Sequence, residues 1–361
     1  MQSNAAAFSN AMRMIISETS MIGLVMTSVV AFVISVALTR RFCDPASRLH
    51  VLDHPNERSL HSRPTPRTGG VAIFVALSVA VALWGLGTGL TSSLFYGLGA
   101  GAGLVAALSF LDDRKGLPVS VRLPGHLVVA ALLVIGGLFL PDFSLPGVAW
   151  YWPEWLGILL SLLFLIWMIN LYNFMDGMDG FAAGMAVIGF GTFALLGYLA
   201  SNPDFVTLNL MIVAAAAGFL FFNFPPARIF MGDTGSSLLG LLAGGLSIWG
   251  AREGVFPFWV ALLVFSPFIV DATVTLLHRL GRGERVWQAH KSHYYQRLVQ
   301  SGWGHKKTVL YEYVLMLACG FSALLAQQLN LQGQAALVLF WCLVYPLLMI
   351  GVHRMERKAK S

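Results

Sequence analysis

Apolar runs long enough to cross a bilayer recur along almost the whole chain, and only short polar stretches separate them. An α-helix needs roughly 17 to 25 residues to cross the hydrocarbon layer of a membrane. We predict eleven spans of about this length, at residues 20–39, 69–87, 92–111, 122–140, 155–172, 181–200, 206–222, 235–250, 256–277, 308–328 and 334–352. The pattern predicts an all-α, polytopic membrane helix bundle.

The domain organisation follows from the same pattern. We expect one membrane-embedded domain over residues 1–361, with its polar motifs between about residues 40 and 300 and two further helices at 308–352. Residues 1–19 lack the basic start, short apolar core and cleavage site of a signal peptide, so we take them as mature chain.

Composition agrees with a membrane protein. Hydrophobic residues make up 57% of the chain and charged residues 11%, and the mean hydropathy is +0.72. A soluble chain of 361 residues carries about twice that share of charge. Cys43, Cys319 and Cys342 have no metal-like or redox-like spacing. The glycine run at 97–104 lacks the preceding strand of a nucleotide-binding loop, and we expect it to serve close helix packing.

The positive charge lies in one set of loops. If eleven spans alternate in direction, 21 of the 23 lysine and arginine residues fall in one set of loops and in the C-terminal tail, and only Arg13 and Arg252 fall in the other set. The positive-inside rule then places the C-terminus in the cytoplasm and the N-terminus in the periplasm. The net charge of +6 therefore describes one face, and we expect no nucleic-acid partner.

Polar side chains that could bind a ligand gather in the loops of this same face. The chain places there Asp112 and Asp113 in SFLDDRKGL, Asn170, Asn173, Asp176 and Asp179 in NLYNFMDGMDG, Asn223 and Asp233 in NFPPARIFMGDTGSS, and His290 and His293 in AHKSHYYQRL. Each group alone has an ordinary interpretation, as a helix cap, a solvated helix end or two surface histidines. Together they indicate a shared charged ligand or metal ion.

The types of ligand indicate which metal to expect. Carboxylate and amide oxygens without cysteine favour Mg²⁺, with Mn²⁺ as the alternative. The DGMDG sequence lacks the alternating ligands and closing glutamate of a calcium loop. Basic residues accompany the carboxylates, with His61, Arg63 and Arg67 in HSRPTPRTGG and Arg114 and Lys115 in DDRKGL. Groups that hold a cation beside groups that hold anions are typical of phosphoryl transfer.

Four motifs, in this order and on this side, resemble those of the polyprenyl-phosphate N-acetylhexosamine-1-phosphate transferases: DDRKGL, NLYNFMDGMDG, NFPPARIFMGDTGSS and HKSHYYQRL. The resemblance covers roughly residues 40 to 300 and implies a multi-pass enzyme of the bacterial inner membrane. The implied reaction transfers a sugar 1-phosphate from a UDP-N-acetylhexosamine to undecaprenyl phosphate and releases UMP. The implied partners are these two substrates and membrane lipid, and a homodimer is left open.

The resemblance also implies roles for individual residues. Asn173 and Asp233 match magnesium-site positions, and Asp112 and Asp113 match the catalytic pair, with Asp233 counted as catalytic too. Substrate-binding roles are expected for Arg67, Lys115, Asn170, Asp176, Asp179, Asn223, Phe230, His290 and His293, with Phe230 stacking on the base.

The loop histidines bear on the choice of donor. The peptidoglycan enzyme of this family has a run of histidines there, whereas Lys291 and Ser292 separate the two histidines of this chain. HxxHYYQRL and the HSRPTPRTGG loop resemble the branch that initiates O-antigen and lipopolysaccharide synthesis. A peptidoglycan-precursor transferase that uses UDP-MurNAc-pentapeptide is the alternative, and the identity of the N-acetyl sugar stays open.

The chemistry leaves the role of Asp112 open. A phosphomonoester has a second pKa near 6, so the acceptor is largely a dianion at neutral pH and needs little help from a base. Asp112 could act as a base, as a metal partner or as an electrostatic positioner. We expect Asp112→Asn and Asp233→Asn to abolish turnover.

Asp271 differs from the other acidic residues because it lies inside the ninth predicted span, about 10 Å along a helix from His278. An intramembrane carboxylate is usually functional, and we expect it to face the active-site cavity or to pair with a neighbouring helix. It also motivates the main rival from another class, an ion-coupled secondary transporter. A catalytically inactive binding protein is a third alternative.

Overall fold

The computed structural model describes residues 2–49, 51–55, 60–88, 93–285 and 290–360, with backbone only for residues 2–21, 87, 88, 93–95 and 360. Arg58, one of the basic residues counted above, lies outside the described residues. The long helices are α1 (Gln2–Cys43), α2 (Gly69–Thr88), α3 (Ser93–Lys115), α4 (Val119–Ile135), α5 (Glu154–Met175), α6 (Phe181–Leu199), α7 (Pro203–Asn223), α8 (Gly232–Arg252), α10 (Ser266–Gly281), α12 (Gly304–Ala326) and α13 (Leu331–Lys360). Shorter elements are α9 (Phe258–Val264), α11 (Tyr294–Leu298) and the π-helical turn η1 (Val299–Trp303).

Two small hairpins are the only sheets among the described residues. β1 (Leu52–Asp53) pairs antiparallel with β2 (Thr65–Pro66), and β3 (Asp142–Leu145) pairs antiparallel with β4 (Val148–Tyr151). The prediction of an all-α polytopic bundle is confirmed. Within the described residues, seven helices are long and apolar enough to cross a membrane, and the bent pair α9–α10 would make an eighth.

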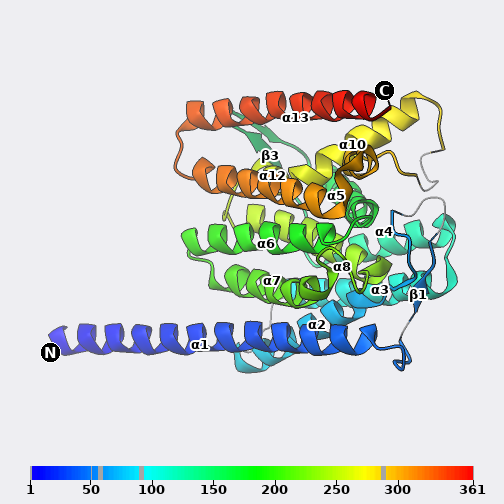
Figure 1. Ribbon diagram of the computed structural model, residues 1–361. Coiled ribbons are helices and arrows are strands. Elements are labelled where there is room, and N and C mark those ends of the chain that lie inside the picture. Colours follow the sequence, from blue (N-terminus) through cyan, green and yellow to red (C-terminus); the bar gives the residue numbers. More distant parts are fainter. Residues whose placement is uncertain (1, 50, 56–59, 89–92, 286–289, 361) are drawn as a thin grey trace.

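The long helices pack as a bundle whose layers are visible in Figure 1. α1, α7, α6, α12 and α13 lie side by side, and the helices that complete the bundle pack behind them. The chain ends lie at opposite ends of the bundle.

The central helix is α8, which is buried along nearly its whole length between α2, α3, α5 and α6. Its many glycines and serines explain why neighbouring helices can pack so closely around it. A Cβ on Gly240 would overlap the backbone of Met168 on α5, and a Cβ on Gly235 would overlap Gly70 on α2. Small residues allow helix backbones to approach this closely. Of the faces offered by the glycine run, Gly97 and Gly101 pack against α4, whereas no other described helix comes within 4 Å of a Cβ placed on Gly99 or Gly103.

The ninth predicted span is not the continuous helix that we expected at 256–277. The chain bends by 81° between α9 and α10. Pro267 lies in the first turn of α10, where its missing N–H costs no intrahelical hydrogen bond, while the same residue cannot continue α9. The bend brings Asp271 into contact with the loop that precedes α11.

Candidate active site

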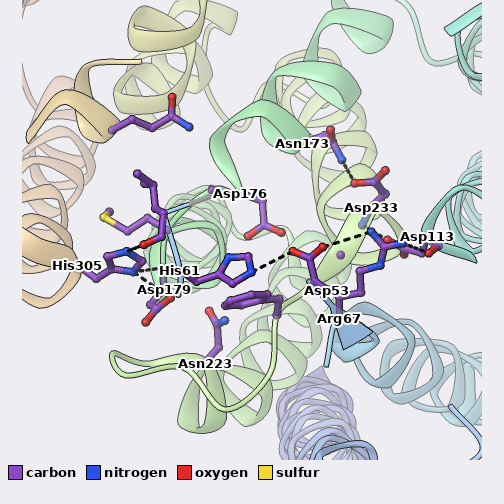
Figure 2. Close-up of a pocket in the computed structure, with 16 residues that line it drawn as sticks. Asp53, His61, Arg67, Asp113, Asn173, Asp176, Asp179, Asn223, Asp233 and His305 are labelled. Carbon is purple, nitrogen blue, oxygen red and sulfur yellow. Dashed lines mark hydrogen bonds and ion pairs between the residues drawn. The ribbon is translucent and has the colours of Figure 1, made fainter. Parts of the chain in front are cut away.

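The predicted polar motifs converge on one cavity of about 200 Å³, lined by residues from both sides of several helix junctions (Figure 2). Its walls come from the β1–β2 segment, the end of α3, the α5–α6 junction, the α7–α8 loop and the starts of α11 and α12. Of the residues that the sequence singled out, it collects Arg67, Asp113, Asn173, Asp176, Asp179, Asn223, Phe230 and Asp233.

The NLYNFMDGMDG segment distributes its four polar side chains because its helix ends in the middle of the motif. α5 ends at Met175, and Asp176 already has non-helical dihedral angles. Gly180 has φ +74°, a conformation that costs little only for glycine. Asn173 and Asp176 therefore line the cavity, while Asn170 points elsewhere, donating a hydrogen bond to the Ile166 carbonyl at 2.7 Å.

Asp233 lies in the first turn of α8, deep in the bundle, with about a third (34%) of its side chain exposed toward the cavity. The amide of Asn173 donates to its Oδ1 at 2.7 Å. Burial is the largest cause that raises the pKa of Asp233, to about 7, and the Asp113 carboxylate raises it further, while the Asn173 hydrogen bond lowers it. The carboxylate form of Asp233 is thus disfavoured unless a cation joins it.

Asp113 is held at the N-terminus of α8. Its carboxylate accepts hydrogen bonds from the backbone N–H groups of Asp233, at 2.9 Å, and Thr234, at 3.0 Å, and from the Thr234 hydroxyl at 2.6 Å. Gly232, with φ +71°, leaves no room for a Cβ against this carboxylate. Asp113 therefore caps α8 from the end of α3 and fixes the position of Asp233.

Asp112 turns away from its neighbour into a small hollow behind the cavity, lined also by Arg122, His126, Asn170 and Asp233. Arg122 donates to Asp112 Oδ2 at 2.9 Å and lies 3.7 Å from Asp233 Oδ2. The two carboxylates of the expected catalytic pair thus have different partners. Both lie close to Asp233: Asp113 accepts from its backbone N–H, and Asp112 lines the same hollow as its side chain. In the sequence, Arg122 was recognisable only as part of the positive charge of this face.

Asp176 lies between the two ends of the cavity in Figure 2. No hydrogen bond to its carboxylate is found among the described residues. Burial raises its pKa well above the ordinary value, and the charges of Asp233, Asp113 and Asp179 add to the rise. It is a second carboxylate that a bound cation would stabilise.

The end of the cavity opposite Asp233 is formed by Asp179, His305 and Asn223 (Figure 2). His305 Nδ1 lies 3.0 Å from Asp179 Oδ1, and Asp179 Oδ2 accepts from the Ala227 N–H at 2.9 Å. The Asn223 side chain accepts from the Gly180 N–H and donates to the Ile229 carbonyl, so it ties the α5–α6 junction to the α7–α8 loop. Its role in this structure is to shape the wall.

The β1–β2 segment supplies the positive side of the cavity. Arg67 donates to the Asp113 carbonyl and lies 3.8 Å from Asp53, and His61 Nε2 lies 3.6 Å from the same carboxylate. Among the described residues, Arg67 Nε and His61 Nε2 are buried and make no hydrogen bond, although both side chains lie near the Asp53 carboxylate. Phe230 packs against the His61 ring at 4.8 Å between ring centres. Two buried nitrogen atoms without hydrogen bonds, beside an aromatic ring, suit an anionic, ring-bearing ligand.

A wider groove of about 590 Å³ continues outward from the end of the cavity that Asp179 and His305 form. It shares His61, Asp179, Phe230 and His305 with the cavity and adds Arg63 and Lys306. His305 was not identified from the sequence, where it follows GWG as an isolated histidine and gives no recognisable signal.

The two predicted loop histidines do not line the cavity. His293 is buried and lies 3.2 Å from Asp271. Asp271 also accepts from the backbone N–H groups of Tyr294, at 2.9 Å, and Tyr295, at 3.0 Å. The intramembrane carboxylate thus does not line the cavity, and the other expectation, that it pairs with a neighbouring helix, is confirmed, because it holds the start of α11. His290 hydrogen-bonds Ser292 at 2.7 Å.

Lys115 is also outside the cavity: it is the last residue of α3 and is exposed. Gln296, Asp53 and His305 line the cavity although the sequence did not point to them. Gln296 is placed there by the short helix α11. The preceding residue of this helix, Tyr295, donates from its hydroxyl to the Phe174 carbonyl at 3.2 Å.

The carboxylates fit a hard cation, although they do not form a complete cage. Among the described residues, no group of three histidine, cysteine, aspartate or glutamate side chains is close enough to hold a metal ion. Mg²⁺ commonly takes one or two protein carboxylates together with substrate phosphate and water. Asp233 and Asp176 have raised pKa values, and the amide of Asn173 contacts Asp233 through its nitrogen. Two such carboxylates and one amide suit an incomplete site of this kind.

Comparison with known proteins agrees with this geometry. Residues 95–251 match glycosyl transferase family 4. The chain is 31% identical to the probable undecaprenyl-phosphate N-acetylglucosaminyl 1-phosphate transferase of Bacillus subtilis, over 82% of this chain and 84% of the relative. It is 32% identical to the decaprenyl-phosphate N-acetylglucosaminephosphotransferase of Mycobacterium tuberculosis, over 81% and 80%. It is 32% identical to the phospho-N-acetylmuramoyl-pentapeptide-transferase of Shouchella clausii, over 68% and 78%.

The sequence motifs whose residues line the cavity and the relatives that match most of the chain indicate the same family. The chain belongs to glycosyl transferase family 4, the membrane-embedded polyprenyl-phosphate N-acetylhexosamine-1-phosphate transferases, and is a phosphotransferase.

Proposed function

We propose that the protein transfers an N-acetylhexosamine 1-phosphate from a UDP-sugar to undecaprenyl phosphate, releasing UMP and starting a lipid-linked glycan of the O-antigen type. The observation that carries the proposal is the cavity itself, which gathers five carboxylates, Asn173, Arg67 and His61 at one end of a membrane bundle. By the charge distribution, this end faces the cytoplasm of the bacterial inner membrane.

The residues divide into a donor side and a reacting side. We place the uridine against Phe230 in the outer groove and the diphosphate between His61, Arg67 and Asp176. Asn173, Asp176 and Asp233 would hold Mg²⁺, which when bound would neutralise charge on the diphosphate. Arg67 and His61, each with a buried nitrogen that makes no hydrogen bond among the described residues, face the same phosphates.

The main barrier to the reaction is the repulsion between the two anionic substrates, the lipid phosphate and the UDP-sugar, and not the lack of a base. A phosphate oxygen of the lipid attacks the sugar-linked phosphorus of the donor, and the bond from that phosphorus to UMP breaks. Because the attacking phosphate is largely a dianion at neutral pH, no protein group has to remove a proton. Arg67 and the network around Arg122 reduce the electrostatic repulsion between the substrates.

The donor is proposed to be a UDP-N-acetylhexosamine that lacks the peptide. The Bacillus subtilis and Mycobacterium tuberculosis relatives bear N-acetylglucosamine names, whereas the Shouchella clausii relative bears an N-acetylmuramoyl-pentapeptide name. The separated loop histidines favour the first group. A UDP-sugar panel tests this on purified protein with undecaprenyl phosphate, measuring radioactive sugar in the organic phase and released UMP. Transfer from UDP-MurNAc-pentapeptide alone would reverse the assignment, and no transfer from any donor would reject the reaction.

The raised pKa of Asp233 predicts a pH dependence. The folded protein without metal keeps a proton on Asp233 up to about pH 7, whereas the unfolded chain loses it near 3.8. This group therefore makes folding less favourable as pH rises from about 4 to 7. A cation that displaces the proton reverses the effect, so the thermal stabilisation by Mg²⁺ should grow from pH 6 to pH 8. Below the pKa, apparent Mg²⁺ affinity should rise up to about tenfold per pH unit.

Thermal unfolding in EDTA and in Mg²⁺ across this range checks the prediction without relying on activity. In Asp233→Asn the Mg²⁺-induced shift in melting temperature should be small at every pH. An unchanged shift in that variant would place the ion elsewhere.

A further inference from the structure

A second polar pocket, of about 350 Å³, lies on the other side of α11 from the catalytic cavity. The two share no lining residue. Gln296 on α11 lines the catalytic cavity, while Tyr294 and Arg297 of the same helix line the second pocket. The remaining walls come from the C-terminal part of α10, residues 291 and 292, η1 and the end of α13. We call it the basic pocket.

Its lining carries far more cationic than anionic groups. The cations and imidazoles that line it are His278, Arg279, Arg282, Lys291, Arg297 and His353. Its one carboxylate is Glu356, which pairs with Arg297 at 2.5 Å. Within the described residues, no carboxylate lies within ion-pair distance of Arg282 or Lys291. The pocket therefore keeps an excess of positive charge for a ligand to neutralise.

Two of the guanidinium groups are held in place before any ligand arrives. The Arg279 side chain is only 7% exposed, and its Nε donates to Glu284 at 2.8 Å while its Nη2 donates to the Arg285 carbonyl. Arg297 lies over the Tyr294 ring, 4.8 Å from its centre. Fixed guanidinium groups, with the Thr275 and Ser292 hydroxyls beside them, are suited to the oxygens of a phosphate.

The basic pocket lies close to apolar side chains of α13 that are exposed. Ile350 and Leu347, which are 48% and 66% exposed, lie about one and two turns before His353 of the pocket lining. The exposed leucines of α10 lie on the opposite face of that helix from its pocket residues. An apolar helix face that leads to a basic pocket is arranged for a molecule with hydrocarbon chains and an anionic head.

We propose that the basic pocket binds the phosphate group of an anionic membrane lipid, whose acyl chains lie along α13. A soluble anion would use the cations but gain nothing from the exposed Leu347 and Ile350, which is why the geometry favours a lipid. This site does not depend on the proposed reaction, since none of its residues lines the catalytic cavity.

The test measures lipid retention by the full-length protein. The protein is prepared in phosphatidylcholine nanodiscs with and without phosphatidylglycerol, and native mass spectrometry counts the anionic lipids that stay bound. Arg282→Gln/Lys291→Gln removes two cations of the pocket that are not held in internal ion pairs. We expect its affinity for phosphatidylglycerol to fall on the order of 25-fold, because each cation near an anionic lipid contributes about fivefold.

The matched control is Arg354→Gln/Arg357→Gln, which removes the same charge from exposed positions of α13 outside the pocket and should retain the lipid. Glu356→Gln tests the pocket in the opposite direction, since removing its carboxylate should strengthen retention even if the first variant folds poorly. Equal retention by both double variants overturns the site. Displacement of the lipid by millimolar inorganic phosphate would assign the pocket to a soluble anion instead.

Discussion

Asp233→Asn is expected to lower the rate of sugar-phosphate transfer on the order of a thousandfold or more. The amide has the size of the carboxyl group and can still accept a hydrogen bond from Asn173, so the substitution removes mainly the charge. The folded protein disfavours the charged form of this carboxyl group, whose pKa is raised to about 7. Asn173 and Arg122 lie beside the carboxylate, and Asp113 accepts a hydrogen bond from the backbone N–H of the same residue. The measurement is radioactive transfer into lipid at saturating Mg²⁺.

The melting temperature distinguishes lost chemistry from lost folding in this variant. Because the charged form of Asp233 is disfavoured in the folded protein, its replacement by an amide should leave the melting temperature in EDTA unchanged or raise it. Asp142→Asn, in the β3–β4 hairpin and outside the cavity, is the matched control and should keep full activity. If Asp233→Asn retains more than a tenth of wild-type turnover, its charge is not part of the reacting site.

Asp112→Asn is expected to have the second largest effect, again abolishing measurable turnover, and the structure gives a specific reason. Arg122 donates to Asp112 at 2.9 Å and lies 3.7 Å from Asp233. Without the Asp112 charge, Arg122 has Asp233 as its remaining carboxylate partner in the hollow. We expect the guanidinium to move toward Asp233 and to compete there with a divalent cation.

A double variant distinguishes the roles that Asp112 could have. If Asp112 acts by holding Arg122 away from Asp233, Asp112→Asn/Arg122→Gln should recover part of the activity lost in Asp112→Asn and should need less Mg²⁺. If Asp112 acts as a base or binds the metal directly, removing Arg122 as well should give no recovery. Thermal unfolding of each variant should accompany the kinetics, because both side chains are buried or half-buried.

Most of the carboxylates that line the cavity could be predicted from the sequence. Carboxylates and amides are costly inside a membrane protein, so a chain with only 17 acidic residues reveals its functional loops by where those residues stand. Asp113, Asn173, Asp176, Asp179 and Asp233 all line the cavity. Histidines and arginines gave a weaker signal, because they are common at the ends of any membrane span.

That weaker signal explains the errors of placement. His290 and His293 fall in a family motif, yet one contacts Ser292 and the other Asp271, away from the cavity. His305 and Arg122 have no motif and still reach Asp179 and Asp233. Which histidine or arginine reaches a site depends on the contacts that hold its segment in place. For His293, His305 and Arg122, that contact is a carboxylate from a segment distant in sequence.

By itself, the sequence determined the membrane location, the approximate spans and the set of carboxylates at one end, because hydropathy and charge are local properties of the chain. Only the tertiary structure decided which carboxylates share a cavity, how the adjacent residues Asp112 and Asp113 take different partners, and that Asp271 anchors α11. These outcomes depend on where one helix ends beside another. The 81° bend between α9 and α10 and the close approach of α2 to the glycines of α8 set those positions, and contacts between segments distant in sequence leave no periodic signal in the chain.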